Sequence, residues 1–264
     1  MIVKKSAAEI EEIAAAGEIL AEVLAHLATL IKPGVRTEQL DREAERLIRA
    51  RGATPTFKGY HGFPASICAS PNGVVVHGIP GRYRLQAGDV ISIDVGVTYR
   101  GWVADAARTF AVGRIERRTQ ALLAATERAL YAGIAKAQPG SRLGAVSAAI
   151  QAEVESAGFS VVRQLVGHGV GRQMHEDPQV PNFGSPDSGP ILEEGMVLAI
   201  EPMTTAGSPA VRIGADGWTV FTADGSVAAH FEHTVAVTAE GPRILTPWHR
   251  AAAREGLTAS ASTC

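Results

Sequence analysis

The sequence is poor in cysteine and in net charge, and both shortages restrict its function. It holds two cysteines, Cys68 and Cys264, among 264 residues. That number is too small for a disulfide framework, so we expect a reducing compartment. The formal net charge is −2, which gives no support for a nucleic-acid-binding surface, and the usual nucleic-acid-binding signatures are absent.

The chain also lacks an evident targeting or membrane segment. Its first residues, MIVKKSAAEIEEI, have no apolar core of the kind that a signal peptide needs. No run elsewhere looks long enough to cross a bilayer. With 46% hydrophobic and 20% charged residues, the composition is that of an ordinary globular protein, and we expect a cytoplasmic location.

Helix and strand signals alternate in two similar blocks. Ser6 and Glu9 form a capping box before a helical apolar pattern that Pro33-Gly34 ends. Thr37 is expected to cap a second helix that runs to Gly52, and short strands follow to about Gly113. Further helices are predicted at about 117–137 and 143–157, and further strands near 161–166, 196–201, 218–222 and 232–238.

Two local matches at almost one offset suggest an internal duplication. PGVR at 33–36 resembles PGSR at 139–142, an offset of 106, and LQAGDVISID at 85–94 resembles LEEGMVLAIE at 192–201, an offset of 107. Each match by itself could be common turn-and-strand sequence. Together they predict two related halves that pair about a pseudo-twofold axis, with Asp94 and Glu201 in equivalent strands.

Carboxylates inside apolar strands call for a partner. Asp94 and Glu201 each end a β-branched or aliphatic run, and buried carboxylates need a paired charge or a metal ion. Asp105, Glu232 and His168 complete a set of oxygen and nitrogen donors, which suits two divalent ions bridged by carboxylates. Asp105 or Glu232 alone could instead be a solvated strand end, and His168 and His77 could be structural.

Several motifs in combination give the sequence a resemblance to the type I methionine aminopeptidases, metallopeptidases of the pita-bread fold. The resemblance covers about residues 5–246 and depends on HGIP at 77–80, IDV at 93–95, GHGVGRQMHEDP at 167–178, EPM at 201–203 and EHT at 232–234. It implies an α+β fold with duplicated helix-helix-strand halves around a curved, mainly antiparallel sheet. We expect one catalytic domain at 1–250, with halves at about 1–113 and 114–246, and a loosely ordered tail at 251–264.

The resemblance also implies roles for individual residues. The metal ligands of the family fall on Asp94, Asp105, His168, Glu201 and Glu232, with two divalent ions (Co, Mn, Fe or Zn). Glu201 would shuttle protons, and His77 and His175 would be catalytic, substrate-contacting histidines. The methionine pocket would be formed by Tyr60, His61, Phe63, Cys68, Met203 and Trp218, with Met174 a weaker assignment.

Four positions depart from the pattern of the family without removing a ligand. The family often has Cys at the position of Val76 and Ser or Thr at the position of Ala106. Gln is common at the position of His230, and Cys is found at that of Phe57. The short interval of 31 residues between Glu201 and Glu232 favours type I. The sequence starts directly at the first helix, without the N-terminal zinc-binding extension that eukaryotic type I enzymes carry.

The expected substrates are N-terminal methionine peptides and nascent chains with a small second residue. The resemblance further suggests a transient contact with the ribosome, and we expect a monomer that binds neither nucleic acid nor membrane. Two alternatives remain: a proline-specific pita-bread peptidase, and a non-catalytic pita-bread module that binds peptides.

A first prediction concerns the N-terminus of the chain itself. The sequence begins Met-Ile, and Ile2 is too bulky for an enzyme that requires a small second residue. We therefore expect Met1 to be retained on the protein made in its native cytoplasm. Mass spectrometry of the intact protein checks this, and loss of Met1 would contradict it.

Overall fold

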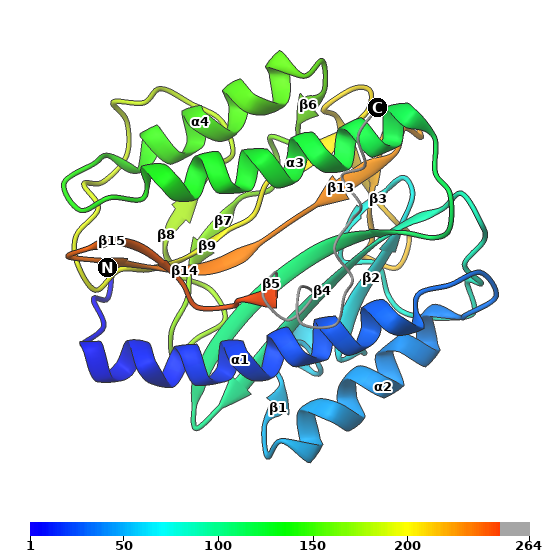
Figure 1. Cartoon of the computed structure of the whole chain (residues 1–264), viewed down its shortest axis with the longest axis horizontal. Helices are drawn as coiled ribbons and strands as arrows, with labels where there is room; N and C mark the ends of the chain where they lie inside the picture. Colours follow the sequence, from blue (N-terminus) through cyan, green and yellow to red (C-terminus); the bar gives the residue numbers. More distant parts are fainter. Residues whose placement is uncertain (249–264) are drawn as a thin grey trace, which may run out of the picture.

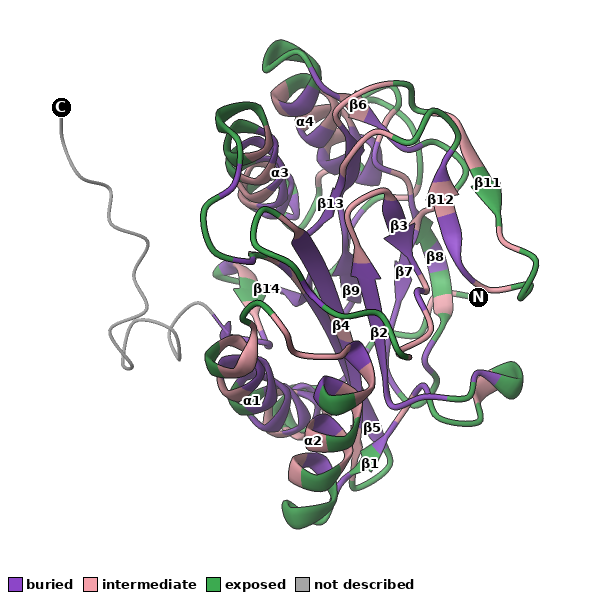
Figure 2. Ribbon diagram, turned by 90° about the vertical axis from the view of Figure 1, so that its right-hand side faces the viewer, coloured by how far each residue is buried: buried purple, intermediate pink, exposed green. Residues whose placement is uncertain are grey.

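Two pairs of helices lie on one side of a layer of antiparallel strands in the computed structural model, which describes residues 1–248 (Figures 1 and 2). Helix α1 (Ala7–Leu30) packs against α2 (Thr37–Ala50), and α3 (Arg117–Lys136) packs against α4 (Leu143–Ser156). The strands that the two helix pairs cover are largely buried (Figure 2).

The first half is built around one long strand hairpin. Strand β4 (Val90–Tyr99) pairs with β5 (Trp102–Ala111), β2 (Ile67–Pro71) and β1 (Thr54–Pro55), all antiparallel. A short 3₁₀ turn, η1 (Tyr60–Gly62), precedes β2, and β3 (Val74–Val76) follows it. Asn72-Gly73 separate β2 from β3, and Asn72 has a left-handed φ of 53°.

The second half has shorter strands in three groups. The largest sheet has the order β15 (Gly241–Ile244), β14 (His233–Thr238), β9 (Val197–Ile200), β7 (Gly167–Gly169) and β8 (Glu176–Val180). A second sheet has the order β13 (Ala228–His230), β10 (Met203–Thr205) and β6 (Ser160–Val161). In the third sheet, β11 (Val211–Ile213) pairs with β12 (Val220–Thr222), which pairs with β3 of the first half. Every pairing between these strands is antiparallel.

The predicted duplication is confirmed by backbone bonds as well as by element order. Gly34 N–H donates to Leu85 O at 2.7 Å, and Gly140 N–H donates to Leu192 O at 2.8 Å. The isolated bridges Arg36–Arg84 and Arg142–Ile191 are related in the same way. The two turns before α2 and α4 are therefore one structure used twice, with offsets of 106 and 107 residues.

One strand of the first half corresponds to two strands of the second. In β4, Val97 lies opposite Pro55 of β1, and 107 residues later Thr204 of β10 lies opposite Val161 of β6. The equivalent of continuous β4 is therefore β9 followed by β10, interrupted at Glu201-Pro202. Proline has no N–H to continue a ladder, so the break falls at the carboxylate that matches Asp94.

Helix α1 shows why length and composition alone mislead about membranes. Within residues 1–248 this one helix is long and apolar enough to cross a bilayer by those criteria, so the expectation that no such run exists was wrong. The helix packs against β4 and β5, and its inner face is buried, including Ile13, Leu20 and Leu27 at 0–1% exposure. Its apolar character is therefore accounted for by core packing.

Two local expectations also need correction. The residue that caps α2 is Arg36, while Thr37 is the first helical residue, and its hydroxyl instead exchanges hydrogen bonds with the backbone of Gly81. Only Ser160–Val161 forms a strand where 161–166 was expected. The residues after Val161 lead into the cavity described below. The expected tail at 251–264, with Cys264, lies outside the described residues.

The close approach of α1 to the backbone of Leu245 leads to a testable prediction. A methyl group at Gly17 would lie within 1.9 Å of the carbonyl oxygen of Leu245. Gly17→Ala raises helix propensity by about 1 kcal/mol, yet we expect a net loss of roughly 2 kcal/mol because the backbone must shift. Urea unfolding measures it, with Ala15→Gly as a control for propensity alone. A variant as stable as the wild type would contradict this packing.

Candidate metal centre and adjoining pocket

The hairpin β4–β5 brings Asp94 and Asp105 to one face of the sheet. Its turn uses Arg100 and Gly101 with φ of 50° and 79°, the left-handed pair that matches strand twist. Asp105 lies opposite Gly96, two residues from Asp94. Residues two apart on a strand share a face, so both carboxylates project to the same side.

His168 stands between two glycines in β7, and both glycines allow close approach of neighbouring backbone. A methyl group at Gly167 would lie 2.3 Å from Ala199 O, and one at Gly169 would lie 2.1 Å from Asp177 O. The Nδ1 atom of His168 is 2.9 Å from Gly169 O. Donation of the Nδ1 proton to that carbonyl leaves Nε2 as the free nitrogen that a metal ion can use.

Hydrogen bonds fix the backbone of the two glutamates, and one of them joins Glu232 to the first half. Glu232 N–H donates to Ala107 O at 2.9 Å, and Trp248 Nε1–H donates to Glu232 O at 3.0 Å. Asn182 Nδ2 donates to Glu201 O at 2.9 Å. Both glutamate side chains thus start from fixed backbone while their carboxylates remain free to act.

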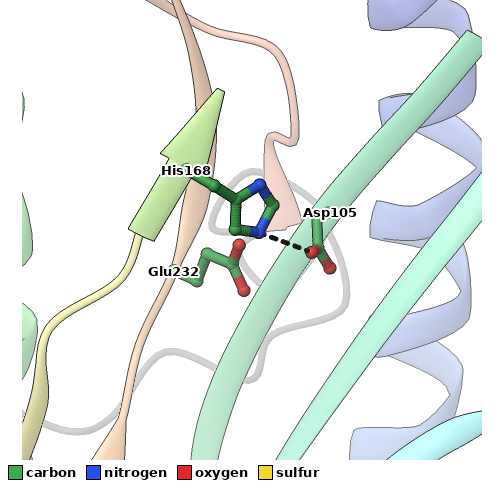
Figure 3. A group of neighbouring side chains, drawn as sticks. All are labelled: Asp105, His168 and Glu232. Atoms are coloured by element: carbon green, nitrogen blue, oxygen red, sulfur yellow. Dashed lines mark ion pairs between the residues drawn. The ribbon is translucent and has the colours of Figure 1, made fainter. Parts of the chain in front are cut away.

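The five predicted metal ligands line one cavity. His168 Nε2 lies 3.7 Å from Asp105 Oδ2 and 3.6 Å from Glu201 Oε1. Asp105, His168 and Glu232 each offer a donor atom within 4.8 Å of the others (Figure 3). Asp94 lines the same cavity, so the structure brings together all five residues that the sequence singled out.

Burial raises the pKa of all four carboxyls in this group, and neighbouring carboxylates add to the rise for three of them. Burial raises the pKa of Glu201 to about 8. Burial raises that of Asp94 to about 7, the nearby charge of His230 lowers it, and the charge of Glu201 adds to the rise. For Asp105 and Glu232 the pKa is well above the ordinary value, through burial and then neighbouring carboxylates.

Burial acts on the histidines in the opposite direction. It lowers the pKa of His168 and of His77 to about 4, with smaller contributions from the neighbouring rings His175 and His230. The pKa of His175 is also lowered, by burial and then by His61. The imidazoles are therefore neutral at physiological pH and able to donate a lone pair.

The donor set fits a divalent cation. Among residues 1–248, Asp94 Oδ1, Asp105 Oδ1 and Glu232 Oε1 are buried without a hydrogen-bond partner. Such oxygens are costly unless a charge compensates them. Four carboxylates and an imidazole are the donors that Mn, Fe, Co and Zn accept.

His230 lies directly beside this group, although sequence comparison noted it only as a departure. Its Nε2 is 3.4 Å from Glu201 Oε2 and 3.9 Å from Glu232 Oε2, and the side chain is 2% exposed. Within the described residues neither ring nitrogen has a hydrogen-bond partner. Asp105 in β5 lies opposite Gly96, and His230 in β13 lies opposite Met203, the residue that corresponds to Gly96 in the second half. His230 is therefore the counterpart of Asp105, and extending the duplication to these strands could have revealed it.

A cavity of about 390 Å³ opens onto the carboxylates, and every predicted substrate-contacting residue lines it. Its apolar part has Phe63 stacked edge-on against Trp218, with ring centroids 5.2 Å apart, and Cys68 and Met203 beside them. Met203 is 1% and Cys68 4% exposed. Burial and the neighbouring Asp94 raise the pKa of the Cys68 thiol well above its usual value, so the sulfur acts as an apolar wall.

The polar rim of the cavity carries the remaining histidines. His77 follows β3 in a left-handed conformation, φ 57°, which turns the side chain into the cavity. Tyr60 Oη lies 2.7 Å from His175 Nδ1, and His175 stacks edge-on to His168 at 4.3 Å between centroids. The ring of His61, which is exposed, lies 4.3 Å from the ring of Tyr60, measured between centroids.

Three further residues of this wall were not predicted from the sequence. Gln164, Leu165 and Val166 also line the cavity, in the segment expected to be a strand. Phe57, Val76 and Met174 line it too. Ala106 is fully buried in the core on the opposite face of β5 from Asp105, so a hydroxyl at 106 would not point toward the carboxylates.

The sequence model of Metallopeptidase family M24 matches residues 11–239, and the chain belongs to this family. Among its relatives, "Methionine aminopeptidase" of Clostridium perfringens is 53% identical over 246 residues, 93% of this chain and 99% of the relative. "Methionine aminopeptidase 1" of Bacillus subtilis is 52% identical, with the same coverage.

Solved structures agree on the fold. The crystal structure of methionine aminopeptidase from Thermotoga maritima has a TM-score of 0.92 and 44% identity, covering 93% of this chain and 99% of that one. Prolidase from Pyrococcus furiosus has a TM-score of 0.77 at 24% identity, covering 92% of this chain and 65% of that one. The second likeness shows the shared pita-bread fold, which confirms the expected α+β architecture.

The raised carboxyl pKa values predict how pH acts on the metal-free protein. Above pH 6.5, the ordinary pKa of histidine, the folded state still binds protons on Asp94 and Glu201 that the unfolded chain has lost. The free energy of unfolding should therefore fall by at least about 1 kcal/mol between pH 6.5 and 8. Below pH 6.5 the histidines act in the opposite direction. Urea unfolding in chelator, across pH, measures this.

Two controls sharpen that measurement. Protein saturated with Mn²⁺ should not lose stability over the same interval, because the cation binds the ionised carboxylates. Glu201→Gln should reduce the pH dependence of the metal-free protein and weaken metal binding. A metal-free protein that gains stability from pH 6.5 to 8 would contradict the electrostatic account.

Proposed function

We propose that this protein removes the N-terminal methionine from proteins and nascent chains whose second residue is small, with two divalent metal ions. The proposal depends on the meeting of two kinds of lining, charged and apolar, within one cavity. A cluster of acids and imidazole, suited to cations, borders a pocket of sulfur and aromatic side chains. An unbranched thioether side chain fits such a pocket.

The proposed ligands are Asp94, Asp105, His168, Glu201 and Glu232. Asp105 and Glu232 would bridge both ions, Asp94 would hold one, and His168 with Glu201 would hold the other. When bound, the ions supply the Lewis acidity that activates water near neutral pH and polarises the scissile carbonyl. The metal itself is one of Co, Mn, Fe or Zn.

The residues of the chain perform the proton transfers and the positioning. Glu201 accepts a proton from the attacking water and delivers it to the leaving amine, a role for which a buried carboxyl with a raised pKa is suited. His175 donates a hydrogen bond to the oxygen that gains negative charge, and His77 supports the scissile amide or the tetrahedral centre. Tyr60 orients His175 through the bond to Nδ1.

The shape of the cavity accounts for cleavage at the N-terminus. Phe63, Trp218, Cys68, Met203 and Tyr60 enclose the methionine side chain, and His61 lies at the mouth. The free α-amino group of the substrate would lie toward the carboxylates and their cations, where an internal peptide bond offers no equivalent group. The enzyme therefore acts as an aminopeptidase.

The remaining parts of the proposal concern context. Residues 1–250 form one catalytic domain with halves at about 1–113 and 114–246. The protein works as a monomer in the cytoplasm, contacts the ribosome transiently, and binds neither nucleic acid nor membrane.

The decisive experiment is methionine release from Met-Ala-Ser by metal-free protein reconstituted with Co²⁺, Mn²⁺, Fe²⁺ or Zn²⁺ in turn. We expect release with at least one of these metals, none in chelator, and little or none from Met-Ile-Ser. Cleavage of a Xaa-Pro dipeptide in preference would favour a proline-specific peptidase. Failure to bind any of the four metals would favour a peptide-binding module instead.

Variants test the individual roles under the best metal. Glu201→Ala and His77→Ala should each lower kcat by two or more orders of magnitude, while circular dichroism stays that of the wild type. Near-wild-type turnover in either variant would remove that residue from the mechanism. Arg118→Ala, on the helix side of the sheet, serves as a control and should leave turnover unchanged.

A further inference from the structure

The first residues of the chain lie against the loop that carries His175. Lys5 Nζ contacts Glu176 Oε2 at 2.6 Å and Val3 O at 2.9 Å. The side chain of Lys5 is 2% exposed and that of Glu176 is 12% exposed. Glu176 follows His175 directly, so the ion pair fixes the backbone next to a proposed catalytic side chain.

The local sequence is built around this ion pair. A methyl group at Gly171 would lie 2.6 Å from both Glu176 Oε1 and Lys5 Cε, so a larger residue there would displace the pair. Lys5 N–H donates to Gly195 O at 2.7 Å, and Gly195 in turn leaves room for the backbone of Lys5. The second oxygen of Glu176 accepts from Gln173 N–H at 3.2 Å. Both partners are thus held on more than one side.

His175 itself is exposed at the rim of the cavity. Its side chain meets Tyr60 Oη and the ring of His168, and both contacts depend on where the loop 171–175 lies, which leads into β8 at Glu176. Apart from these contacts with Tyr60 and His168 the ring faces solvent, so its position follows that of its backbone. The position of its backbone therefore decides whether the ring reaches a substrate oxygen.

We propose that Lys5 is a positioning residue for the reaction: through its buried ion pair with Glu176, the N-terminal segment fixes His175 in its catalytic position. This inference depends on the proposed role of His175. A buried ion pair contributes little net stability compared with apolar groups, but it defines one geometry. Catalysis requires a fixed geometry, since a displacement of about 1 Å can cost roughly a hundredfold in rate.

The neighbouring residue supplies a matched control. Lys4 Nζ pairs with Glu193 Oε2 at 2.8 Å, and both side chains are more than half exposed. Lys4→Met and Lys5→Met therefore remove the same charge from adjacent positions, one at the surface and one in the interior. We expect Lys5→Met to lower kcat on Met-Ala-Ser ten- to a hundredfold with KM changed less than threefold, and Lys4→Met to remain within twofold.

A double-mutant cycle separates positioning from general loss of structure. In a His175→Ala background, Lys5→Met should have no further effect on kcat, because the residue that it positions is gone. Titration with Mn²⁺ should give the same stoichiometry in all these variants. If Lys5→Met lowers kcat equally in both backgrounds, or leaves kcat unchanged in the wild type, the inference is wrong.

A second variant covers the case in which Lys5→Met does not fold. Lys5→Met/Glu176→Gln removes both charges and leaves no isolated buried charge, and it should show the same loss of kcat. Wild-type kcat in this double variant would overturn the inference. Near-wild-type kcat in His175→Ala alone would instead disprove the proposed role of His175, so the two failures are distinguishable.

Discussion

Repulsion between buried carboxylates is the constraint on which the structure depends. Four acids face one cavity; burial raises the pKa of all four, and neighbouring carboxylates raise those of Asp94, Asp105 and Glu232 further. Holding them together requires rigid backbone from both halves. Thr234 Oγ1 donates to Asp105 O at 2.8 Å and accepts from Asp105 N–H at 3.0 Å, while Thr109 makes the matching pair of bonds with His230. These threonines join β5 to β13 and β14 at the point where the charges meet.

The duplication explains the architecture of the site better than its chemistry. Asp94 and Glu201 are true equivalents, yet β4 continues past Asp94 whereas its counterpart breaks at Glu201-Pro202. Asp105 has His230 as its register equivalent, so one half presents a carboxylate where the other presents an imidazole. Two halves of the same architecture thus present different donors to the cavity.

Patterns of charge within apolar runs allowed the carboxylates to be predicted from sequence, because burial of Asp94 without compensation is physically unfavourable. The helices and their stops followed from capping and from Pro33-Gly34. Other features depend on contacts between distant segments and leave no local signal. The hydroxyl of Thr37 bonds to Gly81 instead of capping its helix, Leu165 and Val166 line the cavity instead of extending a strand, and Lys5 reaches Glu176 across 171 residues of sequence. Type I resemblance supplied the methionine pocket, which apolar composition alone could not specify.

The distribution of the proposed ligands between the halves has a consequence for synthesis of the chain. Asp94 and Asp105 emerge from the ribosome first, as a hairpin with two repelling acids and without His168. His168 and Glu201 follow, and Glu232 comes last, on a segment whose backbone must bond to Ala107 of the finished hairpin. A partly translated chain therefore lacks the complete donor set. Under the proposed ligand assignment, full metal binding must follow synthesis of the second half, which contributes His168, Glu201 and Glu232.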